Sequence, residues 1–215
     1  MSRKVMEFGL SLLDEVRLSR AVHVLPRKEP RFAGIVGRYG MPPLWPREPG
    51  FATLALLMLE QQVSLAQART MFQRIVAAAG EMTPQAVRPL GVEGLRAIGV
   101  TRQKSAYLHA LADTLAGGGL DLHELNDLAD DVAADRLDAL HGVGQWTAQC
   151  YLLFALRRPD AFPAADLALM ESTRALWRLR ARPSPEALLK RAEAWRPWRA
   201  VAARLLWHHY LSERA

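Results

Sequence analysis

The sequence predicts an all-α fold, and three observations carry that prediction. Apolar residues recur mostly at the spacing of an amphipathic helix, and the sustained alternation typical of strands is rare. Glycines and prolines fall between these apolar runs, where they end one helix before the next begins. Half of the 215 residues are hydrophobic, so the chain can bury a core and is not expected to be disordered.

The expected helices follow one another with short breaks. Six prolines punctuate residues 1–50 and leave room for a short helix or two joined by loops. Thr83 is a predicted N-cap with Pro84 at the first helical position. The remaining helices are expected over residues 51–79 with a polar interruption at 60–62, over 103–116, 133–140 and 145–157, from Leu167 onward, and twice after Pro183-Ser184-Pro185.

Charge and cysteine content narrow the class of protein. The chain carries 28 Lys and Arg against 22 Asp and Glu, a formal charge of +6 that favours a polyanionic partner. A single cysteine, Cys150, excludes a disulfide framework and a four-cysteine iron–sulfur or zinc site within one chain. The histidines show no HExxH spacing, so we expect no structural transition metal. The N-terminal segment contains acids and no long apolar core, so it is neither a signal peptide nor a membrane span, and a cytoplasmic protein is expected.

The stretch LHGVGQWTAQC, residues 140–150, places two glycines between two helical runs. Gly142 and Gly144 allow the backbone to turn tightly and let a second surface approach closely. They also leave the amides at the start of the following helix uncovered, and such a helix N-terminus suits a phosphate group. A lone Gly-x-Gly is compatible with an ordinary turn between helices, so the residues around it must decide.

Those residues carry a resemblance. Leu140, Gly142, Val143, Gly144, Thr147 and Ala148 have the spacing of the helix-hairpin-helix DNA-binding motif, which this stretch resembles. Asp166 follows a loop containing Pro163 and precedes a helix, where an aspartate is by itself most often an N-cap.

Together, the hairpin, the proline loop and the aspartate resemble the helix-hairpin-helix base-excision DNA glycosylase superfamily. Within it, the chain is similar to the alkylation-repair branch, the 3-methyladenine DNA glycosylase II type. This similarity runs from about Phe51 to the C-terminus and also rests on residues 60–64, 99–104 and 195–199 and on Trp207.

The resemblance implies two helical subdomains with a DNA-binding cleft and the hairpin at their junction. Residues 51–163 would form the central subdomain that contains the hairpin. Residues 1–50 and 164–215 would together form the other.

The implied activity is that of a monofunctional DNA glycosylase. Such an enzyme flips alkylated purines of the 3-methyladenine or 7-methylguanine type out of duplex DNA and hydrolyses the N-glycosidic bond. The resemblance makes Asp166 the catalytic carboxylate, which would stabilise the oxocarbenium-like sugar. It makes Gln62 the wedge that fills the gap left by the flipped base. In relatives with lyase activity, a lysine nucleophile occupies the position of Trp146, so no lyase activity is expected here.

The base pocket would be aromatic, because a cationic alkylated purine is attracted to an electron-rich ring. The family's stacking positions fall on Trp146 and Trp207. A third aromatic position falls on Cys150, and the neighbouring Tyr151 is included in the pocket for that reason. Core packing is the alternative for each of these rings, and it is the expected role of Trp195 and Trp198.

Contacts to the DNA backbone are expected from the hairpin and from one basic segment: Gly142, Gly144, Thr147, Arg102 and Lys104. The resemblance also implies a monovalent cation, Na+ or K+, held by the backbone carbonyls of Asp138, Leu140 and Val143. No cofactor is required. The expected partner is double-stranded DNA containing damaged bases, bound by a monomer with no membrane contact.

Two alternatives stay open. A non-catalytic helix-hairpin-helix DNA-binding protein would need the hairpin and the basic charge, but neither Asp166 nor Gln62. A glycosylase for a different lesion would keep all of these. Against the oxidised-base branches stand the lack of four cysteines and of a hairpin lysine.

Overall fold

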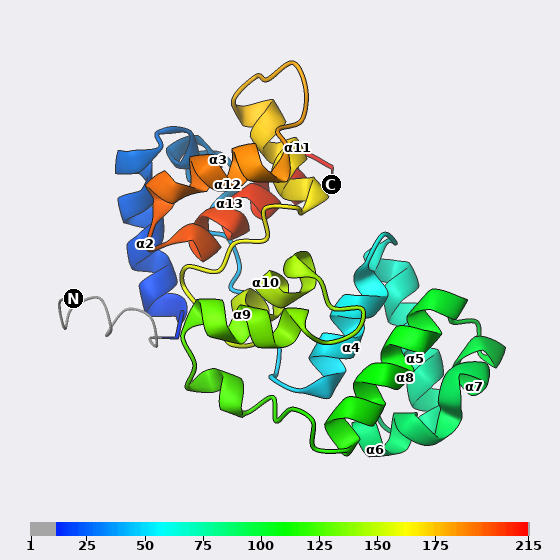
Figure 1. Ribbon diagram of the computed structural model, residues 1–215. Helices are drawn as coiled ribbons and strands as arrows, with labels where there is room; N and C mark the ends of the chain where they lie inside the picture. The colour runs from blue at the N-terminus through cyan, green and yellow to red at the C-terminus, as the bar shows by residue number, and fades with distance from the viewer. Residues whose placement is uncertain (1–11, 215) are drawn as a thin grey trace. The chain divides into compact units, whose positions relative to one another are not determined.

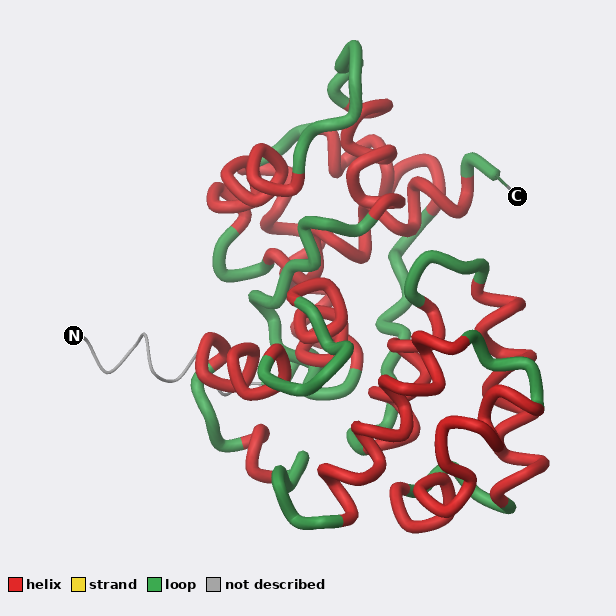
Figure 2. The backbone as a smooth tube through the Cα atoms, turned by 45° about the vertical axis from the view of Figure 1, so that its right-hand side comes forward, coloured by secondary structure: helices red, strands yellow, loops and turns green. Residues whose placement is uncertain are grey.

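The computed structural model describes residues 12–214, and every regular element in that range is helical (Figures 1 and 2). The N-terminal segment, predicted to be neither a signal peptide nor a membrane span, begins outside the described residues. No helix of the described range has the length and apolar character needed to cross a membrane. The α-helices are α2 (Glu15–Lys28), α3 (Arg31–Tyr39), α4 (Phe51–Glu60), α5 (Leu65–Ala79), α6 (Pro84–Val87), α7 (Gly91–Ala97), α8 (Arg102–Ala116), α9 (Asp130–Asp138), α10 (Gln145–Phe154), α11 (Leu167–Leu176), α12 (Pro185–Ala192) and α13 (Arg199–Ser212), and the 3-10 helices are η1 (Arg88–Leu90), η2 (Glu124–Asn126) and η3 (Glu193–Trp195).

The predicted helix starts and stops are confirmed where capping chemistry marks them. The Thr83 hydroxyl accepts a hydrogen bond from the Ala86 amide at 3.3 Å, and Pro84 opens α6. Ser64 caps α5 and forms a capping box with Gln67. The polar interruption at residues 60–62 separates α4 from α5. The all-α prediction is therefore confirmed for the described residues.

The chain forms two compact units: residues 12–46 with 152–214, and residues 47–151. We call them the terminal unit and the central unit. The sequence predicted that the chain leaves the central unit in the proline loop at residue 163, whereas it does so inside α10, between residues 151 and 152. The reason is that the last turn of α10 joins the terminal core. There the Leu153 carbonyl accepts a hydrogen bond from Arg204 at 3.0 Å, and the Phe154 ring stacks on Trp207.

The terminal unit is organised around α13. Residues 200–207 of this helix are all buried, and such a helix without a polar face must be enclosed by its neighbours. Helices α2, α3 and α11 pack against it (Figure 1). Three alanines among these eight residues allow the neighbouring helices to approach closely.

Aromatic rings fill the other part of the terminal core. Trp195 is 1% exposed and meets Phe32, Phe162 and Trp177 at ring-centroid distances of 5.2, 5.8 and 6.1 Å. The expectation that Trp195 is a packing residue is confirmed. Trp198 is half-buried and stands at the N-cap of α13.

Arg204 is a fully buried cation in this core. Its guanidinium donates to the carbonyls of Leu44 at 2.9 Å, Leu153 at 3.0 Å and Ala200 at 3.1 Å. Burial lowers the pKa of Arg204, although arginine stays protonated at neutral pH. The side chain thus joins a loop, the end of α10 and α13 through one charged group.

The central unit is organised around α4. Its sequence, FATLALLMLE, is apolar on almost every side, and residues 53–55 and 57–59 are buried. Helices α5 and α8 pack on it, and α6 and α7 pack against α8. The ends of α4 and α8 therefore have fixed positions within this unit.

Replacing Arg204 by methionine should destabilise the protein by about 3 kcal/mol, because two buried carbonyls outside α13 would lose their donor. Urea unfolding followed by circular dichroism measures this change. Arg20→Met, at an exposed site of α2, is the matched control and should stay within about 0.5 kcal/mol of the unaltered protein. Equal effects of the two substitutions would contradict the assigned role of Arg204.

Candidate functional site

The Gly-Val-Gly stretch forms the turn between α9 and α10. The Val143 amide donates to the Leu140 carbonyl at 3.0 Å and closes the turn. The Ala148 amide donates to the Gly144 carbonyl at 3.0 Å and starts the helical ladder of α10. The structure thus contains the predicted pair of helices with a tight hairpin between them.

The two glycines of the hairpin serve different purposes. Gly142 has a φ of +87°, and a Cβ added there would lie 2.3 Å from Cγ of Tyr107. The Tyr107 ring is itself held, because Gln103 donates to its hydroxyl at 2.8 Å and His141 packs edge-on at 4.8 Å. Gly142 is therefore required by the fold of the central unit.

Gly144, in contrast, is exposed, and a Cβ added there would meet no atom within 4 Å. Nothing within the protein requires a glycine at this position. It lies directly before α10, whose first amides, like those of any helix, have no acceptor within the helix. The open space at Gly144 leaves room for an external anion to approach the first amides of α10.

Gln61 connects the turn after α4 to the hairpin. Its Nε2 donates to the Gly142 carbonyl at 3.0 Å and to the Thr147 hydroxyl at 2.9 Å. Thr147 is only 1% exposed, so its side chain faces Gln61 and not the solvent. The Thr147 side chain is therefore not free for a contact with DNA, and Gln61 has a positioning role that the sequence left undecided.

Lys104 corrects the sequence-based expectation. Its ammonium group donates to the carbonyls of Leu59 at 2.5 Å and Gln61 at 2.9 Å, and the residue is 9% exposed. Burial lowers the pKa of Lys104. The side chain binds the carboxyl end of α4 instead of a phosphate, because the open carbonyls of a helix end attract a cation.

Gln62 is exposed immediately after these fixed contacts, and its φ is +57°. A left-handed conformation is uncommon for a residue other than glycine, and it persists only where the surroundings enforce it. Here the preceding residue, Gln61, is fixed by its side-chain hydrogen bonds to the hairpin and by Lys104, which donates to its carbonyl. A bidentate ion pair between Arg47 and Glu60, at 2.9 and 3.0 Å, fixes the last turn of α4. The Gln62 side chain is thus presented outward from a rigid turn.

Asp166 lies in the terminal unit, at the N-cap of α11. Its Oδ1 accepts a hydrogen bond from the Leu169 amide at 3.0 Å and one from Nε1 of Trp207, also at 3.0 Å. Asp166 is half-buried, and the Trp207 ring stacks on Phe154 at 5.2 Å. The predicted catalytic aspartate and the predicted pocket tryptophan are therefore in direct contact.

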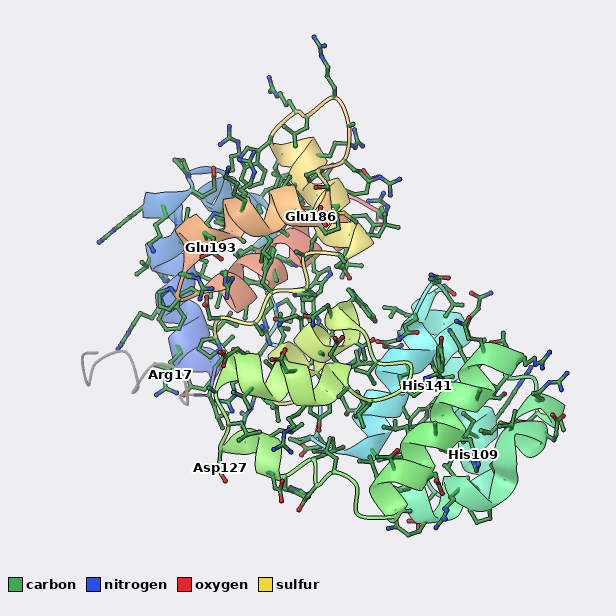
Figure 3. All side chains as sticks on the ribbon, viewed as in Figure 1. Arg17, His109, Asp127, His141, Glu186 and Glu193 are labelled. Atoms are coloured by element: carbon green, nitrogen blue, oxygen red, sulfur yellow. The ribbon has the colours of Figure 1, made fainter. Side chains whose placement is uncertain are left out.

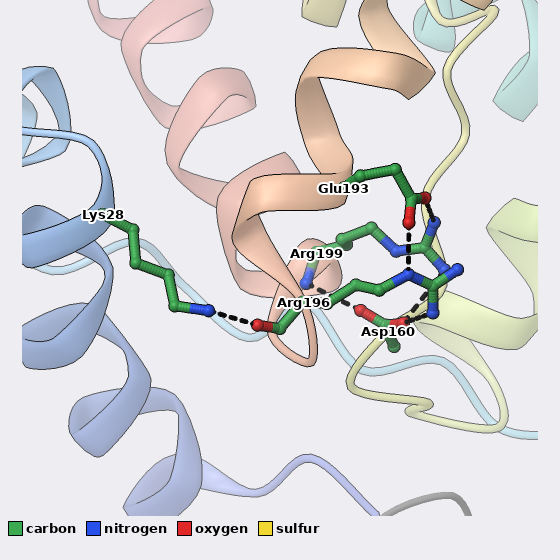
Figure 4. A network of polar contacts seen from close by, with 5 residues as sticks. All are labelled: Lys28, Asp160, Glu193, Arg196 and Arg199. Atoms are coloured by element: carbon green, nitrogen blue, oxygen red, sulfur yellow. Dashed lines mark hydrogen bonds and ion pairs between the residues drawn. The ribbon is translucent and has the colours of Figure 1, made fainter.

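The loop that leads to Asp166 is fastened to α13 by a network of charged groups (Figure 4). Asp160 forms ion pairs with Arg196 at 2.5 Å and Arg199 at 2.9 Å, and Glu193 bridges the same two arginines. Lys28 adds a hydrogen bond to the Arg196 carbonyl at 2.5 Å. The segment WRPWR, on which part of the family resemblance rests, thus positions the loop of Asp166.

The other pocket expectations have mixed outcomes. Trp146 is half-buried in the first turn of α10. Tyr151 is fully buried, its hydroxyl accepts a hydrogen bond from the Gly50 amide at 2.8 Å, and burial raises its pKa to about 12. Including Tyr151 in the base pocket was therefore wrong: it is a core residue. Cys150 is likewise buried.

The remaining expected contacts concern the helix ends of the central unit. Arg102 is exposed as the first residue of α8. The carbonyls of Asp138, Leu140 and Val143 belong to the hairpin and the end of α9, and backbone oxygens of this kind suit a monovalent cation. No group of three or more His, Cys, Asp or Glu side chains within residues 12–214 could hold a metal ion.

A hairpin between two helices, followed by an aspartate at a helix N-cap, defines a known class of DNA repair proteins. The chain matches the HhH-GPD superfamily of base excision DNA repair proteins over residues 56–197 and belongs to it. This confirms the resemblance seen in the sequence.

Individual relatives agree with this assignment. The chain is 29% identical over 181 residues to DNA-3-methyladenine glycosylase 1 of Schizosaccharomyces pombe, covering 82% of this chain and 79% of the relative. It is 30% identical over 158 residues to YfjP of Bacillus subtilis, and the chain covers about half, 55%, of that protein's length. Among solved structures, the S. pombe 3-methyladenine DNA glycosylase in complex with abasic DNA has a TM-score of 0.77 at 28% identity, covering 89% of this chain and 95% of that one.

The different roles of the two hairpin glycines are testable. Gly142→Ala should destabilise the protein by about 2 kcal/mol, because it combines a left-handed φ with a clash against Tyr107. Gly144→Ala should change stability by less than about 0.5 kcal/mol. Guanidinium unfolding of both variants measures this difference, and equal stabilities would contradict it.

Proposed function

We propose that this chain is a monofunctional DNA glycosylase that hydrolyses the N-glycosidic bond of alkylated purines in duplex DNA. The observation that carries the proposal is the Asp166 carboxylate, held by the Leu169 amide and the Trp207 indole. The names of the S. pombe and other relatives, which are 3-methyladenine glycosylases, support the same substrate class. Its setting is base excision repair on damaged double-stranded DNA, as a monomer in the cytoplasm.

The proposed chemistry needs a positioned negative charge. As the base departs, positive charge develops on the sugar in an oxocarbenium-like transition state. Asp166 stabilises that charge and orients a water molecule for attack at the sugar carbon. Two N–H donors fix its Oδ1, so the carboxylate has little freedom to turn away from the reacting atoms.

Aromatic rings would supply the selectivity for alkylated bases. A 3-methyladenine or 7-methylguanine carries positive charge and is attracted to the face of a tryptophan. Trp207, adjacent to the carboxylate and stacked on Phe154, and Trp146 are the proposed pocket residues. Because the base already carries positive charge, it leaves readily, and the site needs no strong general acid.

DNA anchoring would use the hairpin. The open approach at Gly144 and the first amides of α10 suit a backbone phosphate, and the exposed Arg102 adds a cationic contact. A monovalent cation on the carbonyls of Asp138, Leu140 and Val143 would add positive charge at the same phosphate. Gln62 is the proposed wedge, since its side chain projects from a rigid turn and can bond to the orphaned base.

Strand cleavage is not part of the proposed activity. Lyase action requires an amine that forms a Schiff base with the sugar. Trp146 occupies the corresponding hairpin position, and the amine of Lys104 is bound to two carbonyls of the α4 end. The product would be an intact strand with an abasic site.

Asp166→Asn tests the catalytic role without removing the helix cap, because asparagine is an equally good N-cap. Base release from methylated duplex DNA should fall at least about 100-fold, while DNA binding is retained. Asp135→Asn, an exposed carboxylate on α9, is the control and should release bases normally. Strand breaks are scored with and without alkali, and borohydride is added to trap any Schiff base.

Breaks that appear only after alkali, without trapping, support the monofunctional mechanism. An active Asp166→Asn variant would remove Asp166 from the chemistry. DNA binding without base release by the unaltered protein would favour a non-catalytic DNA-binding protein or a different lesion.

Gln62→Gly should lower the single-turnover rate of base release about tenfold, because nothing would fill the gap that the flipped base leaves. Its thermal stability should not fall, since glycine tolerates the left-handed φ at this site. Gln73→Ala, at an exposed position of α5, is the control with an unchanged rate. An unchanged rate for Gln62→Gly would contradict the wedge role.

A further inference from the structure

The loop that joins α11 to α12, residues 177–184, extends beyond the ends of both helices (Figures 1 and 2). We call it the α11–α12 loop. Arg178, Arg180 and Arg182 are exposed on it. Long side chains with nitrogen at their tips project from this loop (Figure 3). None of the residues proposed to act in base excision lies on this loop.

This loop concentrates the positive charge of the chain. Its eight residues contain three arginines and no acid, and residues 171–191 around it contain six Arg and Lys but only two acids. Arg174 and Arg182 share Glu171, at 2.8 and 3.2 Å. Neither Arg178 nor Arg180 forms an ion pair with any residue in the described range 12–214. Two guanidinium groups are thus available to an external anion.

The backbone at the start of the loop holds Arg178 in an unusual conformation. The Arg178 amide donates to the Ala175 carbonyl at 3.2 Å, and the Leu179 amide donates to the Arg174 carbonyl at 2.9 Å. This pair of bonds is the Schellman motif, whose left-handed residue is usually glycine. Arg178 occupies that position with a φ of +51°. An observed strain of this kind suggests a function for the side chain that the fold alone does not require.

Trp177 brings further cations to the base of the loop. The guanidinium groups of Arg31 and Arg191 lie over its ring at 5.1 and 5.0 Å, and Arg31 also pairs with Glu29 at 2.8 Å. Together with Arg178 and Arg180 they form what we call the basic cluster. Arginine is suited to phosphates because its planar fork donates two parallel hydrogen bonds to a phosphodiester.

The basic cluster and Asp166 lie at opposite ends of α11. Its ten residues give it a length of about 15 Å. Asp166 precedes the first residue of this helix, and the cluster follows its last. The full length of α11 therefore separates the cluster from the Asp166 carboxylate.

We infer that the basic cluster binds the phosphate backbone of a second duplex DNA segment while the Asp166 end of α11 engages the first. This inference rests on the proposed function, since that function supplies the first segment. It predicts that the protein passes directly from one duplex to another without a free intermediate. Dissociation from one duplex would then be accelerated by the presence of a second.

The experiment follows the release of a fluorescent undamaged duplex from the full chain in a stopped-flow chase with unlabelled duplex. The observed rate should rise with the concentration of the unlabelled duplex. In the double variant Arg178→Gly/Arg180→Gln, this dependence should fall at least about fivefold, and the slope of log K against log salt for the second segment should fall by roughly two. Single-turnover base release should be unchanged, and the melting temperature should not fall.

Arg20→Gln/Arg27→Gln is the matched control, because it removes the same charge from exposed positions of α2. It should retain the dependence on unlabelled duplex. A release rate that is independent of unlabelled duplex, an equal loss in both double variants, or acceleration by RNA but not by duplex DNA would each overturn the inference. Absence of base release from methylated DNA would count against the proposed function instead, whatever the chase shows.

Discussion

Helix ends are the constraint on which the rest of this structure depends. Every α-helix begins with amides and ends with carbonyls that lack partners within the helix, and each must find one elsewhere. Asp166 satisfies the start of α11, and Lys104 binds the carboxyl end of α4. The residues proposed to act on DNA lie next to these points: Gly144 before α10, Gln62 after α4 and Arg178 after α11.

Two of these helix ends differ from ordinary loops because the segments next to them are rigidly attached. The turn after α4 is fixed by Arg47 with Glu60, by Lys104 and by Gln61, which also reaches the hairpin. The loop before α11 is fixed by the charged groups around Asp160. Side chains that must act on a distorted nucleic acid gain from such supports, because a proposed wedge or carboxylate that moved with its loop would lose its geometry.

Local patterns predicted most of the fold and part of the site. Helical periodicity and caps such as Thr83 and Asp166 are readable because their chemistry lies within three or four residues. Tyr151 and Lys104 were misassigned because their burial depends on partners far along the chain, namely Gly50 and Leu59. Likewise, nothing local separates Gln61 from Gln62, although one faces inward and the other outward. The boundary inside α10 depends on contacts with α13 and was equally beyond reach.

Asp166 joins its proposed chemistry to the architecture through one oxygen atom. Its Oδ1 caps α11 and receives the Trp207 indole from α13, so the same atom joins two helices of the terminal core. Most substitutions here would impair the fold as well as the proposed reaction, and natural selection would act on both at once. Asparagine is the exception, and a single nucleotide change converts an aspartate codon into an asparagine codon. If Asp166 acts as proposed, a lineage could lose the reaction in a single mutational step and keep a folded protein that binds DNA without releasing bases.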